Sequence, residues 1–550
     1  MTAMLMKDSL HVAACLSFAA LGSLPAAATN VSGVITTNTT WLASASPYVL
    51  SGGVTVNDGV TLTIEPGTRV QLGPGVDLVI TNGGRLLAQG APSAPIHFSG
   101  VPGSQERWGG IVVVGRVGSP ETRLAYAQIE DNDFSAVYSA GGTILLDHLT
   151  FGAIDRQYVS VDRSSFRISH CHFPSSTGAF ELIHGIGGIK AGGRGIVRDC
   201  FFGGTSGYND IIDFTGGNRE KKQPIVEFYN NVFVGASDDL IDLDGTDAWI
   251  EGNIFLHAHK NGAPDTSSAI SGGDHRRDTS QVTIIGNLFF DCDQAATAKQ
   301  GNFFTLINNT IVHMTKTGGR DTDDGAVCVR DLDPFPTTFA EGVYLEANII
   351  VDVQQLARNY VSNETVVTCN RNILPFAWTG PGSGNTIGDP KLKHIPELKE
   401  TYFTNWADAQ ILRDWFSLLP GSPGIGTGPN GRDQGGAIPL GASIAGEPVG
   451  TTDQATATLT VGVHRAGCGI PSAGWPNGAG YTHYKWRLDA GAWSEETPID
   501  TPIALAGLAD GPHDVEVIGK RDAGSYQNDP ALGPDAIVTR SRTWTVQTKK

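Results

Sequence analysis

The chain has 550 residues, of which 70 are glycine and 17% are charged. Its Val, Ile, Thr and Phe runs are broken by Gly and Asn, which favours strands and turns over long helices. The formal net charge of −18 argues against nucleic acid as a partner. A single core of this size would be unusually large, whereas a solenoid grows along its axis without that limit.

Residues 1–28 have the pattern of a secretory signal peptide. Lys7 precedes an apolar run over residues 12–24, and the alanines at 26–28 offer a small-residue cleavage site. The run is too short for a membrane span and is followed at once by the polar Thr29 and Asn30. We therefore expect a secreted, monomeric protein without a membrane span, in the periplasm or outside the cell.

Short strand patterns separated by Pro-Gly and Gly-Gly turns fill residues 33–115, as at 54–56, 61–64 and 78–80. This segment, with Pro66-Gly67 and the later Trp108-Gly109-Gly110, resembles the first coils of secreted right-handed parallel β-helix proteins. The resemblance implies an all-β chain in which residues 29–440 form a right-handed parallel β-helix.

An Asn followed by two mostly apolar residues recurs along the middle of the chain. The shortest interval is 22 residues, and the longer intervals fit the same coil with inserted loops. Stacked amides can satisfy one another and the adjacent backbone at a tight corner. The pattern predicts one buried ladder, made of Asn231, Asn253, Asn287, Asn309, Asn348 and Asn372.

A short acidic pattern occurs twice, over residues 209–213 and 238–242. If successive coils stack in register, these segments lie about 4.8 Å apart and their carboxylates converge on one surface. One predicted column contains Glu181, Asp210 and Asp239, and a second contains His184, Asp213 and Asp242. The converging acids are Asp210, Asp213, Asp238, Asp239 and Asp242.

The spacing of these acids has a structural consequence. Positions i and i+3 of a flat strand point to opposite faces, so we expect a bend that turns both carboxylates outward. Crowded carboxylates suit Ca²⁺, which takes six to eight oxygen ligands. Zinc is disfavoured here because His184 is a single imidazole without Cys partners. A solvated acidic strip, or a calcium ion that only staples coils together, stays open as an alternative.

After the coils, a less regular stretch contains a possible helix over residues 406–418. The composition changes after Gly441, and alternating strand patterns appear at 484–489 and 513–518. We expect a linker over residues 441–449 and a β-sandwich over 450–550, similar to the immunoglobulin-like modules of secreted bacterial enzymes. Its expected role is to cap and space the solenoid.

The acidic residues resemble the calcium site of polysaccharide lyase family 9, whose members have a right-handed β-helix. Asp213 and the segment 238–242 match the family's single Asp and its Asp-Asp-x-x-Asp, while Asp210 is an additional acid. The resemblance implies Ca²⁺ as cofactor, an acidic, uronate-containing polysaccharide as partner, and cleavage by β-elimination. Calcium would neutralise the uronate carboxylate while a basic side chain removes the C5 proton.

The base is where this sequence departs from the family. The family places a Lys one coil beyond the acids, and here the corresponding segment, 268–273, has Ser271. We expect Lys299, which regains the same column one coil later, to be the first candidate for the base. Lys260, in the loop between those coils, is the second, and the arginines Arg276 and Arg277 are the third.

Further polar residues are candidates for substrate binding. Arg276 and Arg277 follow His275 and could bind uronate carboxylates, with His184 at the other end of the acidic column. Two other classes of function stay open. A β-helix glycoside hydrolase would use carboxylate pairs about 5–9.5 Å apart without calcium. A non-catalytic, calcium-stapled solenoid that binds carbohydrate or acts at a surface would explain Ser271 equally well.

Overall fold

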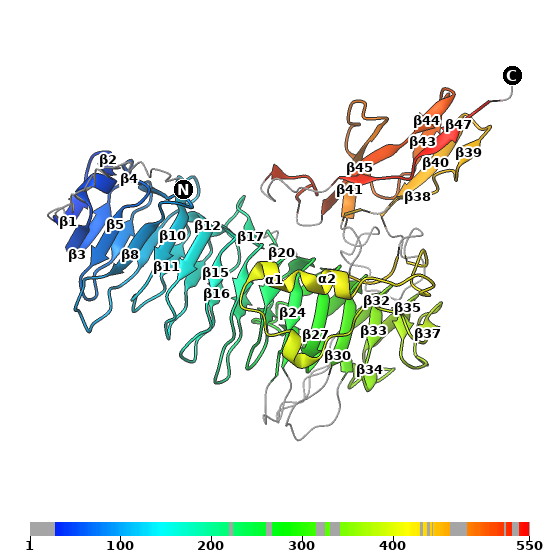
Figure 1. Ribbon diagram of the computed structural model, residues 1–550, viewed down its shortest axis with the longest axis horizontal. Coiled ribbons are helices and arrows are strands. Elements are labelled where there is room, and N and C mark those ends of the chain that lie inside the picture. The colour runs from blue at the N-terminus through cyan, green and yellow to red at the C-terminus, as the bar shows by residue number, and fades with distance from the viewer. Residues whose placement is uncertain are drawn as a thin grey trace, which may run out of the picture.

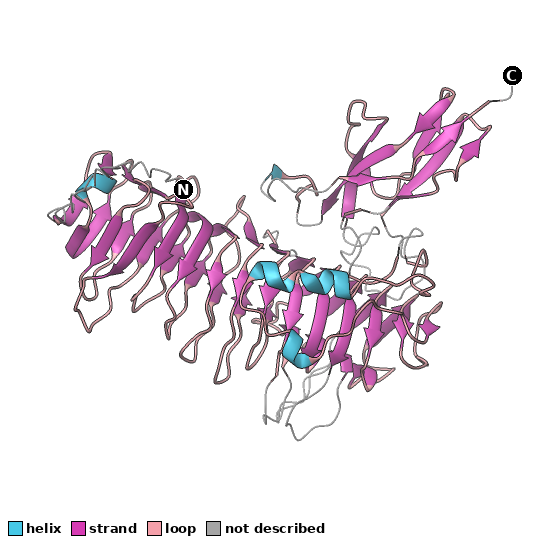
Figure 2. Cartoon of the chain, in the orientation of Figure 1, coloured by secondary structure: helices cyan, strands magenta, loops and turns pink. Residues whose placement is uncertain are grey.

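The computed structural model describes residues 28–218, 224–259, 267–314, 325–329, 341–428, 433–436, 441–442, 444–462, 481–521, 524–530 and 538–548. From Thr29 to Ile387 the chain winds through 37 strands that pair only in parallel (Figures 1 and 2). Apart from β36 and β37, which pair with each other, the strands that succeed one another along the chain lie in different sheets, while strands one coil apart pair. This is a parallel β-helix, as predicted.

The strands form three sheets that run along the solenoid, here called sheets 1, 2 and 3. Sheet 1 contains β6 (Leu78–Ile80), β9 (Ile111–Val114), β11 (Val137–Ala140), β13 (Val159–Asp162), β16 (Ile183–Ile186), β19 (Ile212–Thr215), β22 (Ile241–Asp244), β25 (Ser268–Gly272), β28 (Gln294–Ala298), β31 (Gly325–Cys328) and β34 (Gln355–Arg358). Sheet 2 contains β2 (Thr39–Trp41), β4 (Thr61–Ile64), β7 (Arg85–Gln89), β14 (Ser165–Ser169), β17 (Gly195–Arg198), β20 (Val226–Tyr229), β23 (Ala248–Glu251), β26 (Gln281–Ile285), β29 (Phe303–Ile307), β32 (Gly342–Glu346) and β35 (Val366–Asn370). Sheet 3 contains β5 (Arg69–Leu72), β8 (Ile96–Gly100), β15 (His172–Phe173), β18 (Phe201–Phe202), β21 (Val232–Phe233), β24 (Ile254–Leu256), β27 (Leu288–Cys292), β30 (Thr310–Met314), β33 (Ile349–Val351), β36 (Ile373–Leu374) and β37 (Thr386–Ile387). Four longer strands belong to two sheets or open the first coil: β1 (Thr29–Ile35), β3 (Tyr48–Val56), β10 (Thr122–Ile129) and β12 (Thr143–Phe151).

The interior of the solenoid is filled by side chains that repeat at the same place in each coil. Phe202 stacks on Phe173 and on Phe233, with ring centroids 4.8 Å apart in both pairs. The stack continues through Phe255 to Phe289 at 5.0 and 4.9 Å. These separations equal the spacing of neighbouring strands, so each coil adds one ring to a continuous apolar column.

The predicted Asn ladder is confirmed. Asn231 Nδ2 donates to Asn253 Oδ1 at 2.9 Å, and Asn253 Nδ2 donates to Asn287 Oδ1 at 3.0 Å. The same bond joins Asn287 to Asn309, Asn309 to Asn348, and Asn348 to Asn372. Each of these six amides is fully buried, and each side-chain oxygen also accepts the backbone N–H of the Asn one coil earlier, where there is one.

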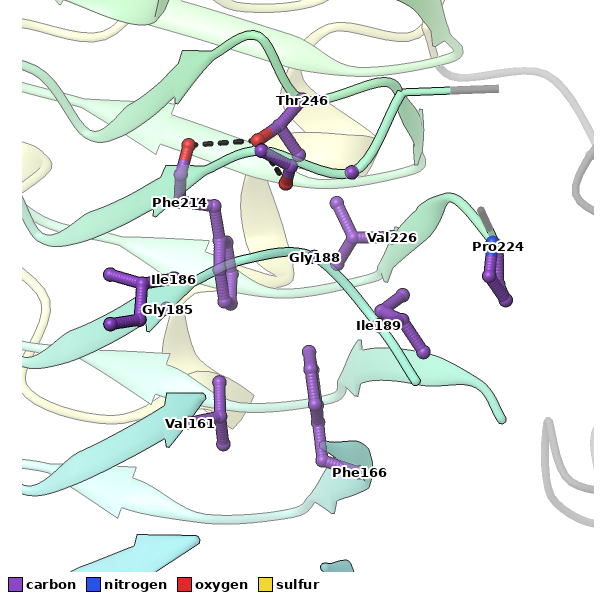
Figure 3. A pocket seen from close by; sticks show the side chains of 12 residues that line it. Val161, Phe166, Gly185, Ile186, Gly188, Ile189, Phe214, Pro224, Val226 and Thr246 are labelled. Carbon is purple, nitrogen blue, oxygen red and sulfur yellow. Dashed lines mark hydrogen bonds between the residues drawn. The ribbon is translucent and has the colours of Figure 1, made fainter. Parts of the chain in front are cut away.

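A pocket lined by described residues of the coils that carry the acids is very small. Figure 3 shows the residues that line it, with Phe166 and Phe214 stacked at 5.8 Å beside Gly185. A Cβ at Gly185 would lie 1.9 Å from the Phe214 ring, so this position requires glycine. The remaining space is about 10 Å³, too small for a ligand. This pocket is therefore not a candidate ligand site.

Short helices cover part of sheet 3. α1 (Trp406–Ala409) and α2 (Ile411–Trp415) lie over the green strands in Figure 1, within the segment predicted to be helical. Leu412 and Phe416 pack on the apolar side chains of sheet 3. The indole N–H of Trp406 donates to the carbonyl of Asn230 at 2.7 Å. Two 3₁₀ helices, η1 (Ala43–Ala45) and η3 (Leu398–Glu400), complete the helical segments that the structure describes.

Three small sheets follow the solenoid and form the C-terminal module, drawn in orange and red in Figure 1. Their strands are β38 (Ile444–Ala445), β39 (Thr451–Thr452), β40 (Thr456–Val461), β41 (Tyr481–Leu488), β42 (Thr497–Pro498), β43 (Ile503–Ala506), β44 (Gly511–His513), β45 (Val515–Arg521), β46 (Thr539–Arg540) and β47 (Trp544–Val546). Most pairs are antiparallel, as expected for a small β-sandwich. The module packs against sheet 2, where Tyr481 meets Trp249 edge to face at 5.4 Å. The sequence predicted only a cap or spacer and did not predict this contact.

The predicted signal peptide lies almost entirely outside the described residues and stays a prediction. In the part of the chain that the structure describes, no helix is both long and apolar enough to cross a membrane.

Candidate metal and catalytic site

Sheet 1 aligns the predicted acidic column. His184 on β16 pairs in register with Asp213 on β19, and Asp213 pairs with Asp242 on β22. The column continues to Ser271 on β25. Because side chains at the same register point the same way, these groups form one line along the outer face of sheet 1. This part of the sequence prediction is confirmed.

The other three acids precede the strands, where the chain bends at Ile211 and at Leu240. Asp210 Oδ1 accepts the backbone N–H of Asp239 at 2.8 Å, and Asp239 Oδ1 accepts that of Ser268 at 2.7 Å. One carboxylate oxygen from each of Asp210, Asp238 and Asp239 lies within 4.8 Å of the others. The predicted bend is therefore present before each of the two strands, and it brings acids from two coils together.

One buried oxygen in this group has no hydrogen-bond donor among the described residues. Asp213 Oδ1 is inaccessible to solvent and accepts no bond, while Asp213 Oδ2 lies 3.3 Å from His184 Nδ1. The contact with Asp213 raises the pKa of His184. A buried carboxylate oxygen without a donor is costly unless a cation satisfies it.

The carboxylates disfavour one another's ionisation. Burial raises the pKa of Asp210 well above its usual range, and the charges of Asp242, Asp239 and Asp238 add to the effect. Burial also raises the pKa of Asp242 to about 7, against the opposing effect of Lys299. Acids held together at this cost are typical of a site that binds a cation or performs acid–base chemistry.

Lys299 lies beside the acids, but not in the predicted column. Thr297 is the residue of β28 that pairs with Ser271, so the predicted register was wrong by two residues. Lys299 follows the end of β28, where its backbone N–H donates to the carbonyl of Gly272 at 3.2 Å. Its positive charge opposes the rise that burial causes in the pKa of Asp242 and of Asp244.

The other candidate residues are less closely placed. His275 and Asp278 close a turn after β25 through two backbone hydrogen bonds of 3.0 and 2.9 Å. Arg276 and Arg277 occupy the tip of that turn, are exposed, and have φ angles of 53° and 74°. Lys260 lies outside the described residues.

Asp244 belongs to the same surface and was missed by the sequence analysis. It lies two residues beyond Asp242 on β22, so it points to the same face. Its Oδ1 accepts the backbone N–H of Gly273 at 2.7 Å, and burial raises its pKa. The alternation of Asp242, Leu243 and Asp244 carried the signal, because an apolar residue between two acids indicates a strand with one buried face.

These residues fit a calcium ion. The donors are carboxylate oxygens on two adjacent coils, one buried oxygen lacks a donor, and the pKa shifts of Asp210 and Asp242 indicate crowded negative charge. Ca²⁺ accepts irregular arrays of oxygen ligands at about 2.3–2.6 Å. Asp210, Asp238 and Asp239 would hold the ion, with Asp213 and Asp242 next to them.

One comparison with known proteins, the match to a family model, supports the fold. Residues 33–161 match a family model described as a pectate-lyase-like β-helix domain. That match ends before the acidic residues, and no curated protein matches the chain. A solved PL6 family polysaccharide lyase from Pseudopedobacter saltans is similar over 66% of this chain and 92% of its own, with 13% identity and a TM-score of 0.35. A similarity of that degree does not extend to function.

Proposed function

We propose that the protein is a secreted, calcium-dependent polysaccharide lyase that cleaves an acidic, uronate-containing polysaccharide by β-elimination. The observation that carries the proposal is the convergence of Asp210, Asp238 and Asp239 beside the Asp213–Asp242 column, with Lys299 at its edge. An anionic polymer requires a positive site on a chain of charge −18, and a bound cation supplies it.

The residues have separate roles in this proposal. Asp210, Asp238 and Asp239 would hold the ion, with Asp213 and Asp242 next to them, and a bound Ca²⁺ would neutralise the uronate carboxylate and so acidify the C5 proton. Lys299, when uncharged, accepts that proton while the 4-linked sugar departs. At the opposite end of the column, His184 Nδ1 lies 3.3 Å from Asp213 Oδ2. His275, Arg276 and Arg277 would contact substrate from the neighbouring turn.

A glycoside hydrolase is less well supported. Hydrolysis needs two carboxyl groups about 5–9.5 Å apart with different protonation states. Here three carboxylate oxygens lie within 4.8 Å of one another, which favours a shared cation. A non-catalytic, calcium-stapled solenoid is supported by the small, uncharged Ser271 in the column.

Ultraviolet absorbance on a panel of uronate polymers separates the three functions. Elimination creates a conjugated double bond that absorbs, whereas hydrolysis creates reducing ends without this absorbance. We expect an absorbance increase with calcium and none with chelator. If no uronate polymer is cleaved with calcium present, the lyase proposal fails and the stapled solenoid becomes the better account.

The base is tested separately. Lys299→Ala should lower the rate at least about 100-fold, as loss of a general base does. Lys393→Ala is the matched control, because Lys393 makes an exposed ion pair with Asp414 on the helical segment. If the cleavage rate of Lys299→Ala stays within a few-fold of the wild-type rate while Lys260→Ala abolishes cleavage, Lys260 is the base instead.

A further inference from the structure

A second group of metal-ligating side chains lies at the corner between sheets 2 and 3. The corner residues Tyr126, His148 and His170 have φ angles of 45°, 52° and 52°, in the left-handed region. Because this conformation recurs coil after coil, the rings stack. The Tyr126 and His148 centroids are 4.3 Å apart, and those of His148 and His170 are 4.5 Å apart.

Asp147 joins the two histidines. His148 Nδ1 lies 3.0 Å from Asp147 Oδ2, and His170 Nδ1 lies 3.0 Å from Asp147 Oδ1. Nitrogen and oxygen ligands at about 2.0–2.2 Å from a zinc ion are themselves roughly 3 Å apart. One ligand atom from each of the three residues lies within 4.8 Å of the others, so a small adjustment of the rings brings all three to one ion.

The surroundings resemble those of metal-binding histidines. The second nitrogen of each ring faces a polar group, since His148 Nε2 lies 3.5 Å from Tyr126 Oη and His170 Nε2 lies 3.7 Å from an Asp199 carboxylate oxygen. Ser169 Oγ donates to Asp147 Oδ1 at 2.7 Å. Such outer partners fix the ring orientation and strengthen metal binding.

The group is also accessible. The side chains of Asp147, His148 and His170 are 26%, 37% and 38% exposed. His170 and Asp199 line an open cleft of about 500 Å³ that reaches Trp406 on α1. Three protein ligands beside open space leave at least one coordination position for water or a ligand, which is the arrangement of an open metal site.

We propose that Asp147, His148 and His170 bind a divalent transition-metal ion of the zinc class. Two imidazoles and one carboxylate suit such an ion, whereas Ca²⁺ prefers oxygen ligands alone. This site is separate from the acidic residues of sheet 1, so it does not depend on the proposed lyase activity. The competing account is a hydrogen-bonded ladder in which Asp147 merely accepts from both rings.

Zinc titration of the full-length protein by calorimetry tests the proposal, after removal of metals and in excess Ca²⁺ to occupy the acidic residues of sheet 1. Wild type should bind one equivalent of zinc that His170→Ala and His148→Gln each abolish. Ser169→Ala should weaken this binding about tenfold, because it removes an outer partner. Cobalt absorption spectra should show the same site and lose it in the same variants.

The matched control is His172→Ala. His172 lies two residues beyond His170 on β15, and its ring stacks on Phe201 at 5.0 Å instead of facing Asp147. This variant should keep the zinc site. The proposal is overturned if wild type binds no zinc, or if neither His148→Gln nor His170→Ala changes the number of sites. Melting curves without metal show whether each variant is folded.

Discussion

Two groups of buried acids lie on the same coils of the solenoid and differ in how their charge is balanced. On sheet 2, Glu227 and Glu251 are almost completely buried. Glu251 accepts hydrogen bonds from Arg521 at 3.0 Å and from Trp249 at 2.8 Å, and Arg194 lies 3.1 Å from Glu227. On sheet 1, the described acids are six aspartates, with His184 and Lys299 next to them: Asp210, Asp213, Asp238, Asp239, Asp242 and Asp244.

The difference distinguishes structural acids from functional ones. Arg521 belongs to the C-terminal module, and Arg194 also pairs with Asp529 of that module at 2.6 Å. The acids of sheet 2 therefore hold the module on the solenoid, with their charges neutralised by the protein itself. In the proposed function, the acids of sheet 1 bind a cation from solution instead. Each of the following experiments changes the acids of one sheet, their partners or their cation. We expect the acids of the other sheet to respond differently.

Loss of Arg521 should have the largest effect on stability. Arg521→Ala leaves Glu251 buried without its guanidinium partner, and breaking a buried pair from one side costs about 3–5 kcal/mol. We expect denaturant unfolding of the full chain to show a loss of that size. Arg487→Ala is the control, because Arg487 pairs with Glu516 inside the module and is more exposed. Equal losses in the two variants would mean that the module is not held by the sheet 2 acids.

Calcium should have the next largest effect, and only through sheet 1. Free calcium at 100 times its dissociation constant stabilises the folded state by about 2.7 kcal/mol. We expect a corresponding rise in melting temperature in wild type and Glu251→Gln, and little rise in Asp239→Asn. An unchanged melting temperature between calcium and chelator in wild type would exclude a tight site.

Matched carboxamide substitutions should have opposite signs in the presence of chelator. Glu251→Gln weakens charge-assisted bonds to Arg521 and should destabilise the protein by about 1–2 kcal/mol. Asp242→Asn removes one of several repelling charges and should stabilise it by on the order of 1 kcal/mol. Thermal unfolding of the two variants without calcium measures both. If Asp242→Asn destabilises the protein, the negative charge of the sheet 1 acids is already neutralised within the protein.

The sequence was sufficient to predict the features that repeat. The Asn ladder and the alignment of Asp213 with Asp242 follow from side chains that recur at coil intervals, so counting residues places them. The Asp147, His148 and His170 group also recurs at 22 residues and could have been found by the same count. Asp244 could have been found from strand alternation.

Features set by loops or by distant contacts could not be predicted. The prediction placed Lys299 two residues out of register because Ala296, Thr297 and Ala298 carry no distinctive pattern. Only the pairing of Ser271 with Thr297 in the structure fixes the register of this strand. Arg521 and Glu251 are 270 residues apart, and nothing in either local sequence identifies the partner. Such a contact depends on where the module packs, which is a property of the whole fold.

The smallest expected effect is a pH dependence that calcium reverses. The folded pKa of Asp242, about 7, lies above the unfolded value near 3.8, so the folded state binds more protons between these values. Stability in chelator should therefore fall as the pH rises from about 4 to about 7 and change little above that range on account of this group. Asp210 and Asp244 shift in the same direction and add to the slope. Saturating calcium binds the ionised carboxylates and should give a rising slope over the same range. Melting temperatures of wild type and Asp242→Asn across this range, with and without calcium, measure both slopes. If Asp242→Asn leaves the pH dependence of the melting temperature in chelator unchanged, the Asp242 carboxyl is not held protonated by its surroundings. The acids of sheet 1 would then cost the folded state no more free energy than those of sheet 2.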